Sequence, residues 1–217
     1  SAVTWSMPVR YWRSDMQPFV HVSGIAAPML AANIDTDVIM PKQFLKGIDR
    51  QGLDRGLFFD LRFLADGTLN PEFVLNQPAW QGASFLVVGP NFGCGSSREH
   101  AVWGLQQMGI RALIGSSFAG IFYDNCQRNG VLLITLEDAQ VQRIGQLVGQ
   151  AETARVNIDL ETQRISLADG TVIDFQIDTL RKTALLLGLD AIGSTLQRRE
   201  QIKAFERQHL ANNPWLC

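Results

Sequence analysis

The segment Asn91-Phe-Gly-Cys-Gly-Ser-Ser-Arg-Glu-His100 has the strongest chemical signature in the chain. It lies between a short apolar run and a stretch with helical spacing. Glycine-rich backbone ahead of a helix exposes N–H groups, and the helix start adds the positive end of its dipole. With Ser96, Ser97 and the planar guanidinium of Arg98, the pattern predicts an anion site suited to a carboxylate. The structural alternative is a serine-capped helix with Arg98 on the surface.

Two other segments carry polar groups. Asn33-Ile-Asp-Thr-Asp37 places two carboxylates in a loop, where they could serve acid–base chemistry or orient a neighbour. A solvated Asx turn is the simpler interpretation of this pair. Residues 121–130 could contribute Tyr123 to a polar site, but the pattern favours an amphipathic helix with a glycine stop. In that helix Cys126 is expected to be a small buried residue.

Composition and charge exclude several classes of protein. The chain has 217 residues, 46% of them apolar, and a net charge of −2, which indicates a folded protein without electrostatic affinity for nucleic acid or anionic membrane. Its three cysteines and three histidines contain no CxxC, which argues against a self-contained zinc or iron–sulfur site. No apolar run approaches the roughly 20 residues of a membrane span. Without a signal peptide and with reduced cysteines, a cytoplasmic location is expected.

The elements that must position these residues follow from the apolar pattern. Strands are predicted at 19–28, 84–89, 112–115 and 131–136, and helices at 98–108, 118–128 and 137–150. Apolar strands separated by helices of about ten residues indicate a parallel βαβ core. Residues 154–160, 164–167 and 171–175 predict a β-meander, followed by helices at 178–187 and 195–209.

We therefore expect an α/β fold with a central, mostly parallel sheet and a small β-meander. Residues 19–217 are expected to form one domain. Residues 1–18 are expected to be an N-terminal extension or a cloning remnant.

Three segments occur in the same order and at the same spacing in one known family. They are NIDTDVIMPKQFLK (33–46), NFGCGSSREHAVWGL (91–105) and IFYDNCQRNGVLLI (121–134). From about residue 19 onward the chain resembles the small subunit of bacterial 3-isopropylmalate dehydratase, or isopropylmalate isomerase, which is related to the swivelling fourth domain of aconitase. The string GCGSSREH is specific to this superfamily, and PKQFLK favours the isopropylmalate branch. Val102 replaces a proline that is usual in the family, away from the proposed chemistry.

The resemblance implies an aconitase-like swivelling β/β/α domain and a hydro-lyase of leucine biosynthesis. Such an enzyme isomerises 2-isopropylmalate to 3-isopropylmalate by dehydration and rehydration. The resemblance also implies that the chain is active only with a large subunit, which holds a four-iron–four-sulfur (4Fe-4S) cluster. The chain itself is then expected to bind no metal or cofactor.

The same resemblance assigns roles within the motifs. Ser96 matches the catalytic base, Ser97 and Arg98 match residues that hold a substrate carboxylate, and Asp37 matches an aspartate that orients site groups or relays a proton. A serine hydroxyl becomes a base only where N–H groups and positive charge stabilise its alkoxide, which agrees with the predicted anion site. Glu99 and His100 belong to the motif, and both are expected to make structural hydrogen bonds.

Substrate choice in the family lies partly in the loop that corresponds to residues 48–58. Leu53, Leu57 or Phe58 could face the isopropyl group, and Arg50 or Arg55 could bind a carboxylate.

Three alternatives to this function stay open. One is a small subunit for another 2-hydroxy acid, such as homoaconitate, citrate or methylmalate. Another is a non-catalytic anion-binding domain. The third is a hydrolase that uses Cys94 with His100, for which no orienting third group is evident.

Overall fold

The computed structural model describes residues 16–46 and 51–216. Its centre is a mixed seven-stranded sheet with the order β4-β3-β2-β1-β5-β6-β7. The strands are β1 (His21–Met29), β2 (Phe85–Val88), β3 (Ala112–Gly115), β4 (Leu132–Thr135), β5 (Arg155–Asp159), β6 (Arg164–Leu167) and β7 (Val172–Asp174). Strands β1 to β4 pair in parallel, and β5 to β7 add to the other edge of β1 as an antiparallel meander. The predicted α/β class, parallel core and meander are confirmed.

Strand β1 joins the two halves of the sheet because it is longer than its parallel neighbours. Its residues 26–29 pair with β2, and its residues 21–25 pair with β5. The predicted extension at 1–18 falls almost wholly outside the described residues.

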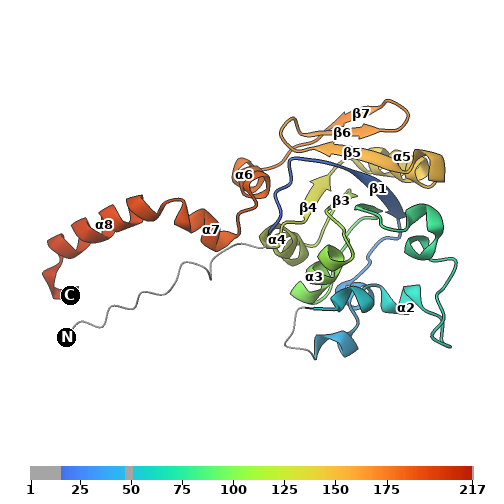
Figure 1. Cartoon of the computed structure of the whole chain (residues 1–217), viewed down its shortest axis with the longest axis horizontal. Coiled ribbons are helices and arrows are strands. Elements are labelled where there is room, and N and C mark those ends of the chain that lie inside the picture. The colour runs from blue at the N-terminus through green and yellow to red at the C-terminus, as the bar shows by residue number, and fades with distance from the viewer. Residues whose placement is uncertain (1–15, 47–50, 217) are drawn as a thin grey trace.

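Helices cover both faces of the sheet (Figure 1). The α-helices are α1 (Thr36–Ile39), α2 (Phe59–Arg62), α3 (Glu99–Gln107), α4 (Gly120–Arg128), α5 (Asp138–Val148), α6 (Thr179–Leu187), α7 (Ala191–Leu196) and α8 (Arg199–Asn212). Short 3-10 helices lie at Lys42–Leu45, Leu53–Arg55, Val74–Asn76, Pro78–Trp80, Ala151–Thr153 and Pro214–Leu216. The single helix predicted at 195–209 is two helices, because Asp190 caps an earlier start and the helical run is interrupted before Arg199.

The alternation of side chains along β2 divides the core in two. Leu86 and Val88 face a cluster that includes residues of α3 and α4, whereas Phe85 and Val87 face a cluster that includes residues of α5 and the meander. All four side chains are buried, as expected for a parallel strand covered on both faces. The sheet is thereby packed against helices on both faces.

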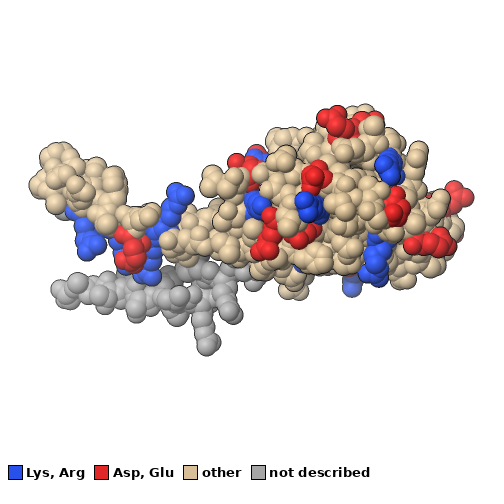
Figure 2. Space-filling view, turned by 90° about the horizontal axis from the view of Figure 1, so that it is seen from above, with Lys and Arg blue, Asp and Glu red and all other residues tan. Residues whose placement is uncertain are grey.

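The surface carries charges of both signs. On the face seen in Figure 2, lysine and arginine alternate with aspartate and glutamate over the body of the molecule. This pattern agrees with the small net charge of −2. Within the described part of the chain, no helix has both the length and the apolar character that crossing a membrane requires.

Candidate active site

Two loops meet at the carboxyl ends of β1 and β2, because these strands are parallel neighbours in the sheet. The loop 33–37 and the loop 90–98 are joined by main-chain hydrogen bonds. Asn33 N donates to Pro90 O at 2.9 Å, Gly93 N to Ile34 O at 2.8 Å, and Thr36 N to Cys94 O at 2.8 Å. The structure thus brings together the two segments whose residue types predicted chemistry. Ligands of open α/β sheets bind at this edge.

The backbone of Ser96 is fixed by two donors. The hydroxyl of Thr36 donates to the Ser96 carbonyl at 2.9 Å, and Arg98 N donates to the same oxygen at 2.9 Å. Thr36 is only 1% exposed, whereas Ser96 and Ser97 are exposed. A serine at the surface is therefore carried by a main chain that is anchored from beneath. Sequence reasoning assigns no role to Thr36, because its partner lies 60 residues away.

Glycine conformations shape this loop. Gly93 has φ of +77° and Gly95 has φ of +93°, values that side-chain-bearing residues seldom adopt. A Cβ atom at Gly93 would also overlap the ring of Phe122 on α4. The two glycines allow the chain to turn sharply while α4 packs close to it.

Arg98 and Asp37 form an ion pair inside the site. Arg98 Nη1 lies 2.7 Å from Asp37 Oδ1 and also donates to Met40 O at 3.1 Å. The Arg98 side chain is 8% exposed and that of Asp37 is 46% exposed. The alternative that placed Arg98 on the surface is therefore wrong. Because these contacts use Nη1, a carboxylate ligand would have to approach the remaining edge of the guanidinium.

The start of α3 contradicts the serine-capped alternative as well. The N-cap residue is Arg98, and no side chain caps the helix. The first-turn amides of α3 are therefore not consumed by a serine hydroxyl, and they contribute positive potential at this end of the helix. For Asp35 the Asx-turn interpretation holds, because its Oδ1 accepts a hydrogen bond from Val38 N at 2.8 Å. Asp37 instead forms the ion pair with Arg98.

Glu99 makes the structural hydrogen bond predicted for it. Asn129 Nδ2 donates to Glu99 Oε1 at 2.8 Å, and Trp103 Nε1 donates to Asn129 Oδ1 at 2.9 Å. His100 packs its ring against Trp103, with ring centroids 4.8 Å apart. Asn129 thereby ties α3 to the end of α4. The sequence pattern indicates Asn129 only as part of a helix stop.

The loop 48–58 is placed only in part. Arg50 lies outside the described residues. Leu53 is 5% exposed, and Leu57 and Phe58 are fully buried in the core beneath α3. In this chain these apolar residues support the loop from within, while Arg55 is exposed.

Among the described residues, neither Cys94 nor Cys126 forms a nucleophilic site with a histidine. Cys94 Sγ donates to Asn33 O at 3.5 Å, whereas the ring of His100 packs on Trp103. Complete burial raises the pKa of the Cys126 thiol well above its usual value, which keeps it protonated. Within residues 16–46 and 51–216, no three His, Cys, Asp or Glu side chains gather as a metal site.

The mixed sheet covered on both faces, with an exposed serine on a glycine-rich loop at the ends of its parallel strands, is an α/β domain, and the comparison with protein families places it in the aconitase class. A family model described as the aconitase C-terminal domain matches residues 16–139. Two further models match residues 143–179 (LeuD_N) and residues 192–216 (the C-terminal domain of the 3-isopropylmalate dehydratase small subunit).

Curated relatives narrow this class to one family. The chain is 60% identical over 201 residues to "3-isopropylmalate dehydratase small subunit 1" of Mannheimia succiniciproducens, covering 93% of this chain and 99% of that protein. It is 51% identical to the corresponding small subunit of Rhodospirillum rubrum, covering 93% and 97%. A solved 3-isopropylmalate dehydratase structure from Methanocaldococcus jannaschii matches with a TM-score of 0.64 and 26% identity, over 86% of this chain and 99% of that chain. The chain belongs to the family of 3-isopropylmalate dehydratase small subunits.

Proposed function

We propose that the chain is the small subunit of a two-subunit hydro-lyase that isomerises 2-isopropylmalate to 3-isopropylmalate in leucine biosynthesis. Identity of 60% over nearly the full length of a relative supports this activity. The observation that carries it is the exposed Ser96, whose backbone is anchored by Thr36 and Arg98. Such a serine is well placed to meet a substrate that a partner subunit presents.

Ser96 is proposed as the base of the reaction. Its oxygen would take a proton from the carbon next to a substrate carboxylate as the hydroxyl leaves the neighbouring carbon, which forms the alkene. Water would then add with the opposite regiochemistry, and Ser96 would return the proton. N–H groups of the glycine turn and the uncapped start of α3 would stabilise the alkoxide in this role.

Arg98 and Asp37 are proposed to act together. The ion pair of 2.7 Å sets the plane of the guanidinium and orients the half-exposed carboxylate of Asp37. Arg98 would then hold a substrate carboxylate through its remaining N–H groups, with the hydroxyl of Ser97 beside it. In the loop 48–58, exposed Arg55, with Arg50, would add a second carboxylate contact, and buried Leu53 would hold this loop in place.

The chain is proposed to act only in complex with a large subunit. The names of its relatives describe them as small subunits. The large subunit would hold a 4Fe-4S cluster, which when bound supplies the Lewis acid for the leaving hydroxyl. Cys94 and Cys126 are free thiols, in keeping with the reducing cytoplasm where we propose that the enzyme works.

Reconstitution with a cognate large subunit tests this function. The two chains are mixed under anaerobic conditions and the alkene is followed by ultraviolet absorbance with 2-isopropylmalate, homocitrate, citrate and 2-methylmalate. The proposal expects turnover that needs both chains and is most efficient with 2-isopropylmalate. A higher kcat/KM for another acid would assign the chain to that substrate. No turnover by a demonstrated complex with a loaded cluster would favour a non-catalytic anion-binding domain.

A further inference from the structure

The last helices of the described chain lead away from the sheet. Helices α7 and α8 and the 3-10 helix Pro214–Leu216 together form a C-terminal arm (residues 191–216), which extends to one side of the domain (Figure 1). Neither α7 nor α8 has a buried residue, and every residue from 195 to 209 is exposed. The arm therefore gains little stability from the domain that carries it.

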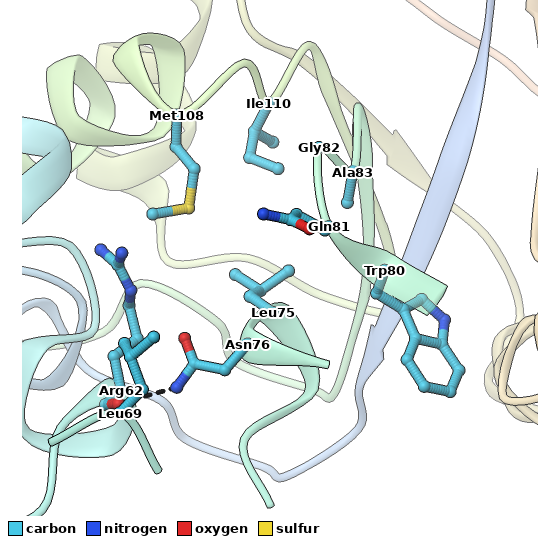
Figure 3. A pocket seen from close by; sticks show the side chains of 10 residues that line it. All are labelled: Arg62, Leu69, Leu75, Asn76, Trp80, Gln81, Gly82, Ala83, Met108 and Ile110. Carbon is cyan, nitrogen blue, oxygen red and sulfur yellow. Dashed lines mark hydrogen bonds between the residues drawn. The ribbon is translucent and has the colours of Figure 1, made fainter. Parts of the chain in front are cut away.

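Exposed apolar side chains gather on this arm. Among the described residues, 13 large apolar side chains are exposed, and six of them lie in the arm: Ile192, Leu196, Ile202, Phe205, Trp215 and Leu216. Elsewhere such residues have their own setting, as Leu69 does at the lining of a pocket on the body of the domain (Figure 3). A concentration of exposed apolar residues marks a surface that another molecule covers.

The apolar residues of α8 share one face of the helix. Ile202 and Phe205 are three residues apart, and the ring of His209 stacks on Phe205 with centroids 5.5 Å apart. These three residues form the apolar stripe of α8, while Lys203 and Arg207 lie on the opposite side at helical spacing. Anchors at positions i, i+3 and i+7 are those with which a helix binds in an apolar groove.

The helix itself needs a partner to persist. Helix α8 has 14 residues and no side-chain cap at its start. An isolated helix of about 12 to 15 residues is only marginally stable in water, and helices in proteins are held mainly by the packing of an amphipathic face. A molecule that covers the apolar stripe would therefore stabilise α8 as well as bind it.

The charge of the arm distinguishes among partners. The arm has four basic and two acidic side chains, which gives it a net charge of +2, whereas the whole chain has −2. Two arms of this chain would repel each other when brought together. An apolar groove with aspartate and glutamate at its rim would attract the arm and accept its stripe.

The family models separate the arm from the part of the chain that carries the site. The model described as the aconitase C-terminal domain matches residues 16–139, which include both site loops. Residues 192–216 match a different model, described as the C-terminal domain of a small subunit. A C-terminal domain is joined to the rest of its protein by the chain itself, whereas a small subunit must be held by non-covalent contacts. The arm is thus present where a covalent link is absent.

We propose that the C-terminal arm docks on the large subunit, with the apolar stripe Ile202, Phe205 and His209 seated in an apolar groove that has acidic residues at its rim. This inference rests on the proposed function, because it takes the large subunit as the partner. The docked arm keeps the loops 33–37 and 90–98 at a high effective concentration beside that partner.

The test measures association of the full chain with a cognate large subunit by sedimentation velocity, independently of turnover. Phe205→Glu should raise the dissociation constant by about tenfold or more. Because Phe205 is 68% exposed, the urea midpoint of the free variant should stay close to wild type, and so should kcat at saturating concentrations of the variant. Val172→Glu on β7 is the matched control, since Val172 is 56% exposed, and it should associate like wild type.

Hydrogen exchange reports on the arm directly. The amides of residues 195–209 should exchange fast in the free chain and at least about tenfold more slowly in the complex. Equal association of wild type and Phe205→Glu, or unchanged exchange of these amides in the complex, would overturn the proposal. A dimer of the free chain that Phe205→Glu dissociates would also overturn it, because a second copy would then cover the stripe.

The same experiment separates this proposal from the proposed function. A wild-type pair that associates but does not turn over 2-isopropylmalate would refute the proposed function, while a tenfold weaker association of Phe205→Glu would still support the docking. Turnover by the wild-type pair together with equal association of Phe205→Glu would refute the docking alone. Failure of the wild-type chains to associate would overturn both.

Discussion

Replacing Thr36 by valine tests how the loop 90–98, which carries the proposed base Ser96, is held. Thr36 is 1% exposed, and its hydroxyl donates to the carbonyl of Ser96 at 2.9 Å. Valine has nearly the same shape, so Thr36→Val removes this hydrogen bond without opening a cavity. The Ser96 carbonyl keeps its second donor, Arg98 N, also at 2.9 Å.

The structure sets the size of the expected effect. Loss of one hydrogen bond to a carbonyl that stays partly satisfied costs about 0.5 to 1.5 kcal/mol of unfolding free energy. The larger effect falls on the rate, because a displacement of about 1 Å in a catalytic group can lower turnover roughly 100-fold. We expect kcat to fall by about 10- to 100-fold while KM changes little.

The assay is turnover of 2-isopropylmalate by the reconstituted enzyme, together with urea unfolding of the chain. Thr36→Ser is the matched control, because it keeps the hydroxyl, and its kcat should stay close to wild type. A Thr36→Val enzyme with wild-type kcat would refute the reasoning, as would an equal loss of kcat in Thr36→Ser.

Three further substitutions test other parts of the account. Gly93→Ala should destabilise the chain by more than about 2 kcal/mol in urea unfolding, because φ is +77° and the ring of Phe122 blocks a Cβ atom. Gly109→Ala is the control, since its φ is +95° but the space around it is open, and it should cost only about 1 kcal/mol. Equal costs for the two substitutions would contradict the packing argument. Arg98→Lys should lower kcat/KM by about tenfold or more although the charge is kept, and unchanged kinetics would argue against a carboxylate contact. Asn129→Leu breaks the link between α3 and α4 and should lower Tm by several degrees, through a loss of about 1 to 3 kcal/mol; an unchanged Tm in calorimetry would show that this link carries no stability.

The strands and the site loops could be predicted because their signals are local. The apolar runs at 84–89 and 131–136 leave little choice other than buried strands, and the glycine-rich loop follows directly after the first of them. Parallel pairing of β1 with β2 then brings the loop 33–37 to the loop 90–98. The meeting of Asp37 and Arg98 in one site thus follows from topology.

What the sequence could not reveal depends on contacts between distant residues. The role of Thr36 requires knowing that Ser96 lies above it, and nothing in the NIDTD segment distinguishes it from an ordinary loop threonine. From sequence, Gly104 indicates only a weakened helix. In the structure a Cβ there would lie 2.5 Å from Met40 Cε, so the glycine permits α3 to pack closely. The same packing buries Leu53, one of the three apolar residues that the family resemblance offered for the isopropyl group of the substrate.

The kcat of Ser96→Ala in the reconstituted enzyme is the most direct test of the central claim. Ser97→Ala is the matched neighbour, since both serines are exposed on the same loop. If Ser96 is the base, Ser96→Ala should form the complex normally and lose at least about 100-fold in kcat, while Ser97→Ala should mainly raise KM. A Ser96→Ala enzyme that turns over 2-isopropylmalate at the wild-type rate would contradict the account.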